Sequence, residues 1–341
     1  MGEMASVDIT EDEAQLYDRQ IRLWGLESQK RLRKARVLVI GARGFGAEVC
    51  KNIILAGVKS VTIMDHGVVD EQDFCSQFLV PRSEIGKNRA EASLERAQEL
   101  NPMVEITADK EKIDDKPDSF FGNFDVVCAT ECTTAQFLHL DNVCRENNIK
   151  FFCGDVYGFF GYIFLDLQIQ EFMEEVTTIT NTHEPTGEPL AKKRKTEKTV
   201  QNTKGTETYV PLQDALDVDW TSESYAKRLK RMDPSYFVMK ALLKFCDKKG
   251  RKPSPSEREK DIESLKEFVK EELTKQKIRE DFVPELLLKD VFAEISPVCA
   301  IMGGITAQEI IKTVSQKERP HNNIFFFNPL KCIGYSACFG V

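Results

Sequence analysis

Three glycines and one acid are spaced like the phosphate- and ribose-binding groups of a nucleotide site. Gly41, Gly44 and Gly46 follow a short apolar run, and Asp65 lies 19 residues beyond Gly46. Backbone amides at a helix N-terminus can hold a phosphate, and an acid at the end of the next strand can hold ribose hydroxyls. However, the glycine spacing is G-x-x-G-x-G and the bulky Arg43 lies inside it. A nucleotide site and a glycine turn kept only for helix–sheet packing therefore both stay open.

The elements around this loop alternate between strand and helix. Arg36–Ile40 is a continuous apolar run of the kind found in strands buried on both faces. A helix ending at Gly57 and a strand at Val61–Met64 complete a βαβ unit. Further expected elements are a helix at 88–100, strands at 104–107 and 125–129, a helix at 133–147, a strand at 150–153, an apolar segment at 291–314, and strands at 324–327 and 333–338. The alternation predicts an α/β fold with a doubly wound, mainly parallel sheet.

The N-terminal part of the chain carries a helix-start signal. Thr10 and Glu13 have the spacing of a capping box, which predicts a helix from Glu11 to Lys34. The expected apolar stripe of this helix comprises Leu16, Leu23 and Trp24, and its basic side comprises Arg19, Arg22, Lys30, Arg31 and Arg33. Arg19 and Arg22 lie one turn apart, on the same face.

A change in composition divides the chain. Near Glu171 the strand–helix alternation stops, and residues 174–204 are rich in Thr, Glu, Lys and Pro. We expect a mobile surface segment there, followed by charged helices as far as Asp281. The sequence thus predicts one α/β domain made from residues 11–170 and 285–341, interrupted by a smaller α+β insertion at 171–284.

Composition excludes several classes of protein. Among 341 residues, 47 are Lys or Arg and 55 are Asp or Glu, which gives a net charge of −8. Such an acidic chain is a poor general binder of nucleic acid. No apolar run approaches the roughly 18 residues of a membrane span. The ten cysteines include no CxxC pair, and the four histidines have no ligand spacing, so we expect no zinc or other metal site in this chain.

One longer motif resembles a known family. The segment Tyr17–Gly25, with the sequence YDRQIRLWG, resembles the opening of the eukaryotic activating enzymes for ubiquitin and ubiquitin-like modifiers, which contain paired adenylation domains of the ThiF/MoeB type. The resemblance continues through the glycine loop, Asp65 and Asn88–Ala97, and resumes at Ser296–Gly304. In length and detail the chain is most similar to the smaller, non-thiol subunits of SUMO-activating heterodimers. The resemblance implies ATP- and Mg²⁺-dependent adenylation of a SUMO-type modifier, and its transfer to a cysteine of a thiol-bearing partner subunit.

Departures from the family pattern imply that this chain's own nucleotide pocket is degenerate. Arg43 intrudes on the glycine loop, Gly67 replaces a second acid, and Arg89 aligns with the usual lysine. The run at Cys75–Phe78 lacks the usual Asn-Arg pair, and Glu131 aligns with the usual Mg²⁺-binding aspartate. The resemblance therefore implies that ATP and Mg²⁺ are bound mainly by the partner, and that the chain is inactive alone.

The same resemblance gives Arg19 a role in trans. The arginine of this motif reaches toward the γ-phosphate of ATP in the other subunit, as a planar and always charged guanidinium can. Arg22 is the alternative residue for that role. Neither Cys132, at the end of an expected strand, nor Cys246, in an apolar helical stretch, is expected to carry a thioester.

Two other interpretations and one targeting signal complete the sequence-based expectations. A degenerate ThiF-like binding scaffold would have the same motifs with no catalytic part, and an NAD-dependent oxidoreductase would use the βαβ unit and Asp65. The basic cluster Lys192–Lys195 indicates nuclear import, so we expect the protein in the nucleus as well as the cytoplasm.

Overall fold

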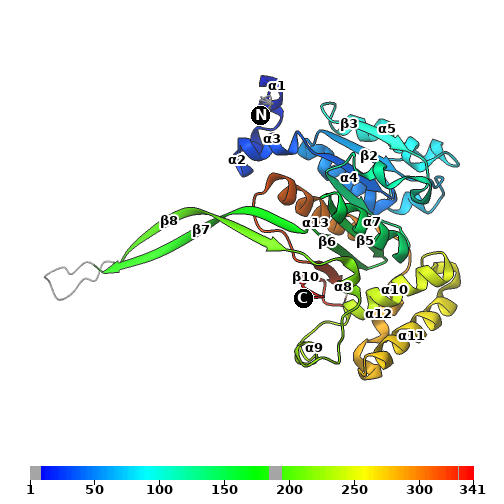
Figure 1. Ribbon diagram of the computed structural model, residues 1–341. Helices are drawn as coiled ribbons and strands as arrows, with labels where there is room; N and C mark the ends of the chain where they lie inside the picture. Colours follow the sequence, from blue (N-terminus) through cyan, green and yellow to red (C-terminus); the bar gives the residue numbers. More distant parts are fainter. Residues whose placement is uncertain (1–8, 184–193, 329) are drawn as a thin grey trace.

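The computed structural model describes residues 9–183, 194–328 and 330–341, and it leaves the side chains of 175–201 undescribed. Its centre is an eight-stranded sheet in the order β10-β9-β6-β5-β4-β1-β2-β3 (Figure 1). The strands are β1 (Arg36–Ile40), β2 (Ser60–Met64), β3 (Glu105–Asp109), β4 (Val126–Ala129), β5 (Lys150–Tyr157), β6 (Phe160–Asp166), β9 (Ile324–Asn328) and β10 (Ile333–Ala337). From β3 to β5 neighbouring strands are parallel, and β6, β9 and β10 extend the sheet antiparallel. The α/β class and the large, mostly parallel sheet agree with the sequence.

Helices cover both faces of this sheet. The helices are α1 (Glu11–Leu16), α2 (Asp18–Trp24), α3 (Leu26–Leu32), α4 (Gly44–Ala56), α5 (Arg89–Leu100), α6 (Asp118–Phe121), α7 (Thr134–Glu146), α8 (Leu212–Leu216), α9 (Glu223–Leu229), α10 (Ser235–Lys249), α11 (Arg258–Lys275), α12 (Glu285–Lys289) and α13 (Ser296–Ser315). Successive strand residues point to opposite faces, so Val37 and Val39 pack with α4 and α13, while Leu38 and Ile40 belong to the core on the α7 and α10 side. The sheet is therefore doubly wound.

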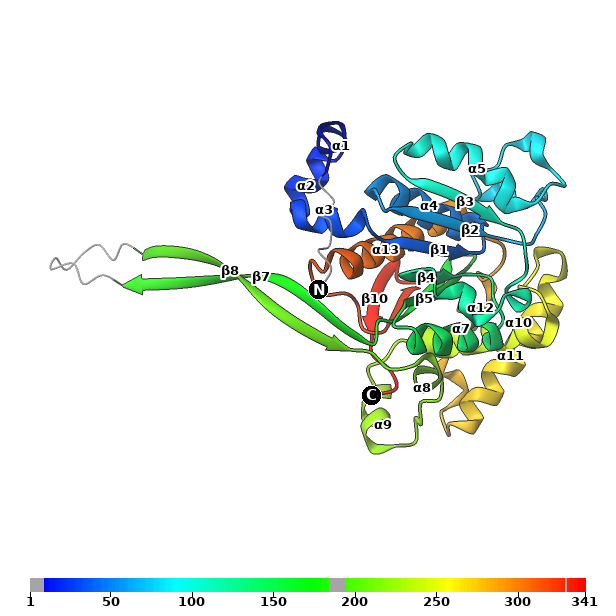
Figure 2. The same ribbon diagram turned by 45° about the horizontal axis from the view of Figure 1, so that its top comes forward.

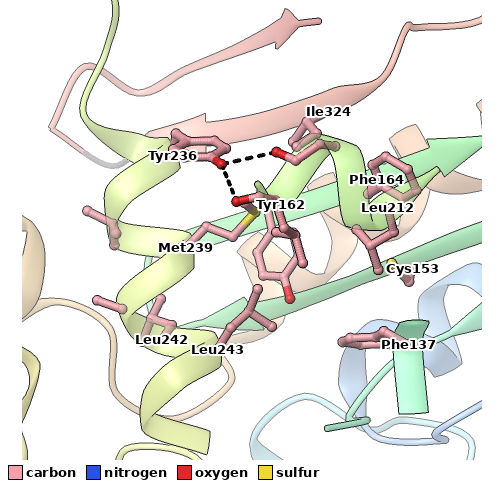
Figure 3. Packing of buried hydrophobic residues seen from close by; sticks show 14 of the residues in the cluster. Phe137, Cys153, Tyr162, Phe164, Leu212, Tyr236, Met239, Leu242, Leu243 and Ile324 are labelled. Atoms are coloured by element: carbon pink, nitrogen blue, oxygen red, sulfur yellow. Dashed lines mark hydrogen bonds between the residues drawn. The ribbon is translucent and has the colours of Figure 1, made fainter. Parts of the chain in front are cut away.

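Helix α10 joins the inserted region to the main core. Its residues Tyr236, Met239 and Leu243 are buried and face Tyr162 of β6 and Phe137 of α7 (Figure 3). Burial of this many large apolar side chains is the main driving force for folding of the region. The insertion thus shares its hydrophobic core with the sheet.

The expected continuous helix from Glu11 to Lys34 is wrong, because the structure has α1, α2 and α3 instead. Tyr17 lies between α1 and α2 with its side chain turned into the protein, at 1% exposure. Gly25 separates α2 from α3 with φ +89°, which ends a right-handed helix. The expected apolar stripe is also wrong for Leu16 and Leu23, which are 53% and 74% exposed.

Residues 169–183 and 194–208 form a long antiparallel ribbon where the sequence indicated no strand. Strands β7 (Ile169–His183) and β8 (Arg194–Thr208) pair in register from Ile169 with Thr208 to His183 with Arg194. In both views the ribbon extends away from the main sheet (Figures 1 and 2). Its mobility stays a prediction, as does the status of 171–284 as a separate domain.

Smaller corrections concern element ends. Strand β5 continues to Tyr157, four residues beyond the expected end. It then turns directly into β6, a strand that the sequence analysis did not predict. Helix α13 (Ser296–Ser315) forms most of the apolar segment expected at 291–314, and it has Pro297 in its first turn, where the missing proline N–H is harmless. Within the described residues no helix is long and apolar enough to cross a membrane.

Candidate functional site: a filled crevice and an exposed arginine

The glycine loop lies where the sequence placed it, between β1 and α4. Each of its glycines packs too closely for a side chain: a Cβ on Gly41 would overlap Thr130, one on Gly44 would overlap Ser76, and one on Gly46 would overlap the Gly41 carbonyl. Gly41 also has φ +85°. Packing of the loop against β4 and its neighbours therefore accounts for all three glycines without a ligand.

Asp65 ends β2 and lies beside the loop, but its carboxylate is already satisfied. Its Oδ2 accepts the Ala42 N–H at 2.8 Å and its Oδ1 accepts the Gly67 N–H at 2.7 Å. Both oxygens also accept hydrogen bonds from the Arg89 guanidinium, at 3.0 and 2.9 Å. A carboxylate that accepts four intramolecular hydrogen bonds has little acceptor capacity left for a ribose.

Arg89 bridges two buried acids. Besides Asp65, it binds both oxygens of Asp73 at 3.1 Å and donates to the Val68 carbonyl at 2.9 Å. Its side chain is only 5% exposed. Burial alone would lower the pKa of Arg89, but the adjacent Asp65 and Asp73 raise it. The guanidinium is thus fixed in its charged form between carboxylates of its own chain.

Arg43 extends across the same crevice. Its guanidinium contacts Asp70 at 3.1 Å, Asp73 at 3.4 Å and Glu131, after β4, at 3.2 Å. The residue that interrupts the glycine pattern is therefore an ion-pair partner for three acids from two segments, one at 70–73 and one after β4. Its positive charge is neutralised within the chain and is not held toward an open site.

A third cation comes from the insertion. Lys252, between α10 and α11, places its ammonium 2.7 Å from Asp155, 2.9 Å from Glu294 and 3.5 Å from Glu131. Asp155 is 1% exposed, and the Lys252 side chain is 26% exposed. Burial would lower the pKa of Lys252, but Asp155 and Glu294 raise it well above its usual value. Burial raises the pKa of Glu131 to about 8, and Glu294 adds to that rise while Lys252 opposes it.

Together these groups fill the crevice at the carboxyl ends of the parallel strands. In open α/β sheets this edge is where ligands bind. Here three cations and six acids bind one another, namely Arg43, Arg89, Lys252, Asp65, Asp70, Asp73, Glu131, Asp155 and Glu294. In the described parts of the chain, no group of three or more His, Cys, Asp or Glu residues could hold a metal ion. The residues present do not fit ATP and Mg²⁺.

The two candidate arginines on α2 differ in their contacts. Arg22 pairs with Asp18 of the same helix, at 3.0 and 3.1 Å. Arg19 is exposed, and within 9–183, 194–328 and 330–341 it makes no ion pair or hydrogen bond. An unpaired guanidinium on the surface is available to an anion outside the chain, whereas Arg22 would first have to release Asp18.

Comparison with known proteins identifies the family of the chain. Residues 17–337 match the ThiF family. The chain belongs to the ThiF family. It is 47% identical to the SUMO-activating enzyme subunit 1 of Homo sapiens over 340 residues, covering 99% of this chain and 98% of the relative. The corresponding proteins of Xenopus tropicalis and Danio rerio are 46% and 47% identical, over 100% and 96% of this chain and 99% and 94% of theirs.

For a ThiF-family chain, the cysteines have unfavourable surroundings for thioester chemistry. Burial, and next Asp155, raise the pKa of Cys132 well above its usual value. Burial raises the pKa of Cys246 to about 11, and its Sγ lies 3.5 Å from the Tyr157 hydroxyl. A nucleophilic thiol needs a lowered pKa. Neither cysteine has one.

The sequence analysis missed three residues of the crevice that lie far along the chain from the glycine loop. Lys252, Asp155 and Glu294 were not candidates, although each is essential to the charge balance. The only signal in the sequence was the run at 249–253, where Gly250 and Pro253 interrupt the charged helices. That run indicates a turn but does not indicate where the turn lies in the fold.

Proposed function

We propose that this chain is the non-thiol subunit of a heterodimeric SUMO-activating enzyme. It would support ATP-dependent adenylation of the C-terminal glycine of a SUMO-type modifier and transfer of the modifier to a cysteine of the partner subunit. The names of its relatives and its membership of the ThiF family support the subunit assignment. The observation that carries the mechanism is the contrast between a filled crevice and an exposed, unpaired Arg19.

Within the heterodimer, ATP and Mg²⁺ would be held mainly by partner residues. ATP would supply the adenylyl group for the modifier carboxylate, with pyrophosphate as the leaving group. The part of this chain would be to present the Arg19 guanidinium to the polyphosphate, where a fixed positive charge stabilises developing negative charge. Arg22 would be a weaker substitute because Asp18 already neutralises it.

The two other interpretations are less well supported. An NAD-dependent oxidoreductase would need Asp65 for a ribose, and that carboxylate already accepts four intramolecular hydrogen bonds. A binding scaffold would need no exposed arginine at all. It predicts that Arg19→Ala leaves catalysis by the assembled enzyme unchanged.

Modifier-dependent ATP–pyrophosphate exchange tests the proposal. The chain alone, the thiol-bearing subunit alone and their mixture are assayed with and without SUMO. We expect exchange only in the mixture with SUMO present. Exchange by this chain alone would mean that its own crevice opens to ATP, and absence of exchange in the mixture would contradict the enzyme assignment.

We further propose that the protein is nuclear and also cytoplasmic. The basic cluster that motivates this begins at Lys192 and Lys193, which lie outside the described residues. Alanine substitution of 192–195 should shift a fluorescently tagged chain toward the cytoplasm. An unchanged nuclear fraction, measured in cells that lack other copies of the chain, would contradict the import role.

A further inference from the structure

The junction between α1 and α2 is anchored by one buried tyrosine. Tyr17 is 1% exposed, and its hydroxyl accepts a hydrogen bond from Asn101 Nδ2 at 2.8 Å. Asn101, just after α5, is 3% exposed, donates to the Ile54 carbonyl at 2.9 Å, and accepts the Met103 N–H at 3.1 Å. A single amide thereby ties together the N-terminal segment, α4 and the end of α5.

The end of α4 is shaped to receive this ring. Gly57 has φ +80°, and a Cβ built there would lie 2.5 Å from Cζ of Tyr17. The ring therefore occupies the space that a side chain at position 57 would need. Glycine at this position permits both the left-handed end of α4 and the close approach of Tyr17.

Side chains of α2 and α3 also bind the last carbonyls of α4. A helix leaves its final carbonyl groups without intrahelical partners. Gln20 Nε2 donates to Leu55 O at 3.4 Å, and Gln29 Nε2 donates to Ala56 O at 3.0 Å. Trp24 Nε1 in turn donates to Gln29 Oε1 at 3.0 Å, which links the end of α2 to α3.

These contacts hold α2 on both sides of Arg19. Tyr17 fixes the start of the helix two residues before Arg19, and Gln20 contacts α4 immediately after it. The side chain of Arg19 itself makes no contact that orients it within the described residues. The direction in which it leaves the molecule therefore depends on how firmly the backbone of α2 is held.

We propose that Tyr17 and Asn101 are positioning residues that fix α2 so that Arg19 is presented to the active site of the partner subunit. The proposal rests on the proposed function. An arginine that acts across a subunit boundary brings a long, flexible side chain, and a misplacement of about 1 Å can lower a rate about 10²-fold. A buried ring with a hydrogen-bonded hydroxyl is a stiff support, because both its torsions are fixed by packing.

The test is a double-mutant cycle in the assembled enzyme, measured by SUMO-dependent ATP–pyrophosphate exchange. Tyr17→Leu and Asn101→Ala are each made alone and together with Arg19→Ala. We expect each single variant to lower kcat about tenfold, with the KM for ATP changed less than about twofold. In the Arg19→Ala background the same changes should lower kcat less than about twofold, because a positioning residue has nothing left to position.

Matched controls separate positioning from a general loss of stability. Gln15→Ala on α1 and Glu99→Ala on α5 alter exposed side chains near Tyr17 and Asn101, and we expect wild-type exchange from both. Tyr17→Phe keeps the ring and removes only the hydroxyl, so it should retain most of the rate. Size-exclusion chromatography confirms that each variant assembles with the partner. If Tyr17→Leu does not assemble, Asn101→Ala alone and combined with Arg19→Ala completes the cycle.

Two results would overturn the proposal. Wild-type kcat for Tyr17→Leu and Asn101→Ala would show that α2 needs no such support. An equal fold-loss of kcat in the wild-type and Arg19→Ala backgrounds would show a structural role unrelated to Arg19. A third result, full activity of Arg19→Ala itself, would refute the arginine role in the proposed function, and it is distinguishable because it needs no variant of Tyr17.

Discussion

Replacing Lys252 by methionine should destabilise the protein in a pH-dependent way. The ammonium of Lys252 is the cation nearest to Asp155, at 2.7 Å, and it also neutralises Glu294 and Glu131. Methionine keeps much of the aliphatic volume and removes the charge. Breaking a buried ion pair typically costs about 3–5 kcal/mol. Because the Lys252 side chain remains 26% exposed, we expect the free energy of unfolding to fall by less than this range suggests, by about 2–3 kcal/mol at pH 7.5.

The sign of the pH dependence follows from the acids that Lys252 faces. Burial raises the pKa of Glu131 to about 8 and raises that of Asp155, and Lys252 opposes both rises. In Lys252→Met both pKa values should rise further, so the folded variant keeps the Asp155 proton at pH values where the folded wild type has lost it, and it keeps the Glu131 proton above about pH 8 as well. Stability then falls with rising pH, by up to about 1.4 kcal/mol per pH unit for each proton. The variant should be close to the wild type at pH 5 and furthest from it at pH 8.

Urea unfolding followed by intrinsic fluorescence at pH 5, 6.5 and 8 measures this difference. The matched control is Lys270→Met on α11, whose pair with Glu280 at 3.2 Å is more than 60% exposed on both sides and should contribute less than about 0.5 kcal/mol. A Lys252→Met variant within about 0.5 kcal/mol of the wild type at all three pH values would refute the filled-crevice account.

Two further predictions concern groups outside the crevice. Asp141 is 1% exposed, its Oδ2 accepts the Leu212 N–H at 2.8 Å, and burial, then Asp166, raise the pKa of Asp141 to about 8. Because the folded state keeps this proton longer than the unfolded state, the wild-type free energy of unfolding should fall by up to about 1.4 kcal/mol per pH unit between about pH 4 and 8. Asp141→Asn should lack that slope and be more stable than the wild type at pH 8. Urea unfolding at pH 5.5 and 8 measures both slopes, and parallel slopes would contradict the prediction. Phe339→Ala should destabilise by about 3–5 kcal/mol, because this fully buried ring lies 4.8 Å from Tyr236; a Tm unchanged within about 2 °C would contradict it.

The sequence was most informative where structure is local. The continuous apolar run of β1, the glycine loop and Asp65 at the end of β2 all lie as expected, because a βαβ unit is set by neighbouring residues. The helix from Glu11 to Lys34 was not foreseen as three pieces. Its helical signals persist across Tyr17, and only the tertiary contact with Asn101 turns that side chain inward.

Long-range contacts account for what the sequence could not predict. Lys252 and Asp155 are far apart in the chain, and nothing in either segment indicates that their side chains meet. The ribbon of β7 and β8 was missed for a different reason. Its Thr- and Lys-rich sequence lacks the alternating apolar pattern of a half-buried strand, which is the signal from which strands are predicted.

The central claim is that this chain contributes an arginine, rather than a nucleotide pocket, to a shared active site. SUMO-dependent ATP–pyrophosphate exchange by the assembled heterodimer carrying Arg19→Ala tests it most directly, with Arg22→Ala for comparison. We expect unchanged assembly with the partner, a fall of about 10³-fold or more for Arg19→Ala, and a much smaller fall for Arg22→Ala. Exchange within about twofold of the wild type for Arg19→Ala would contradict the claim.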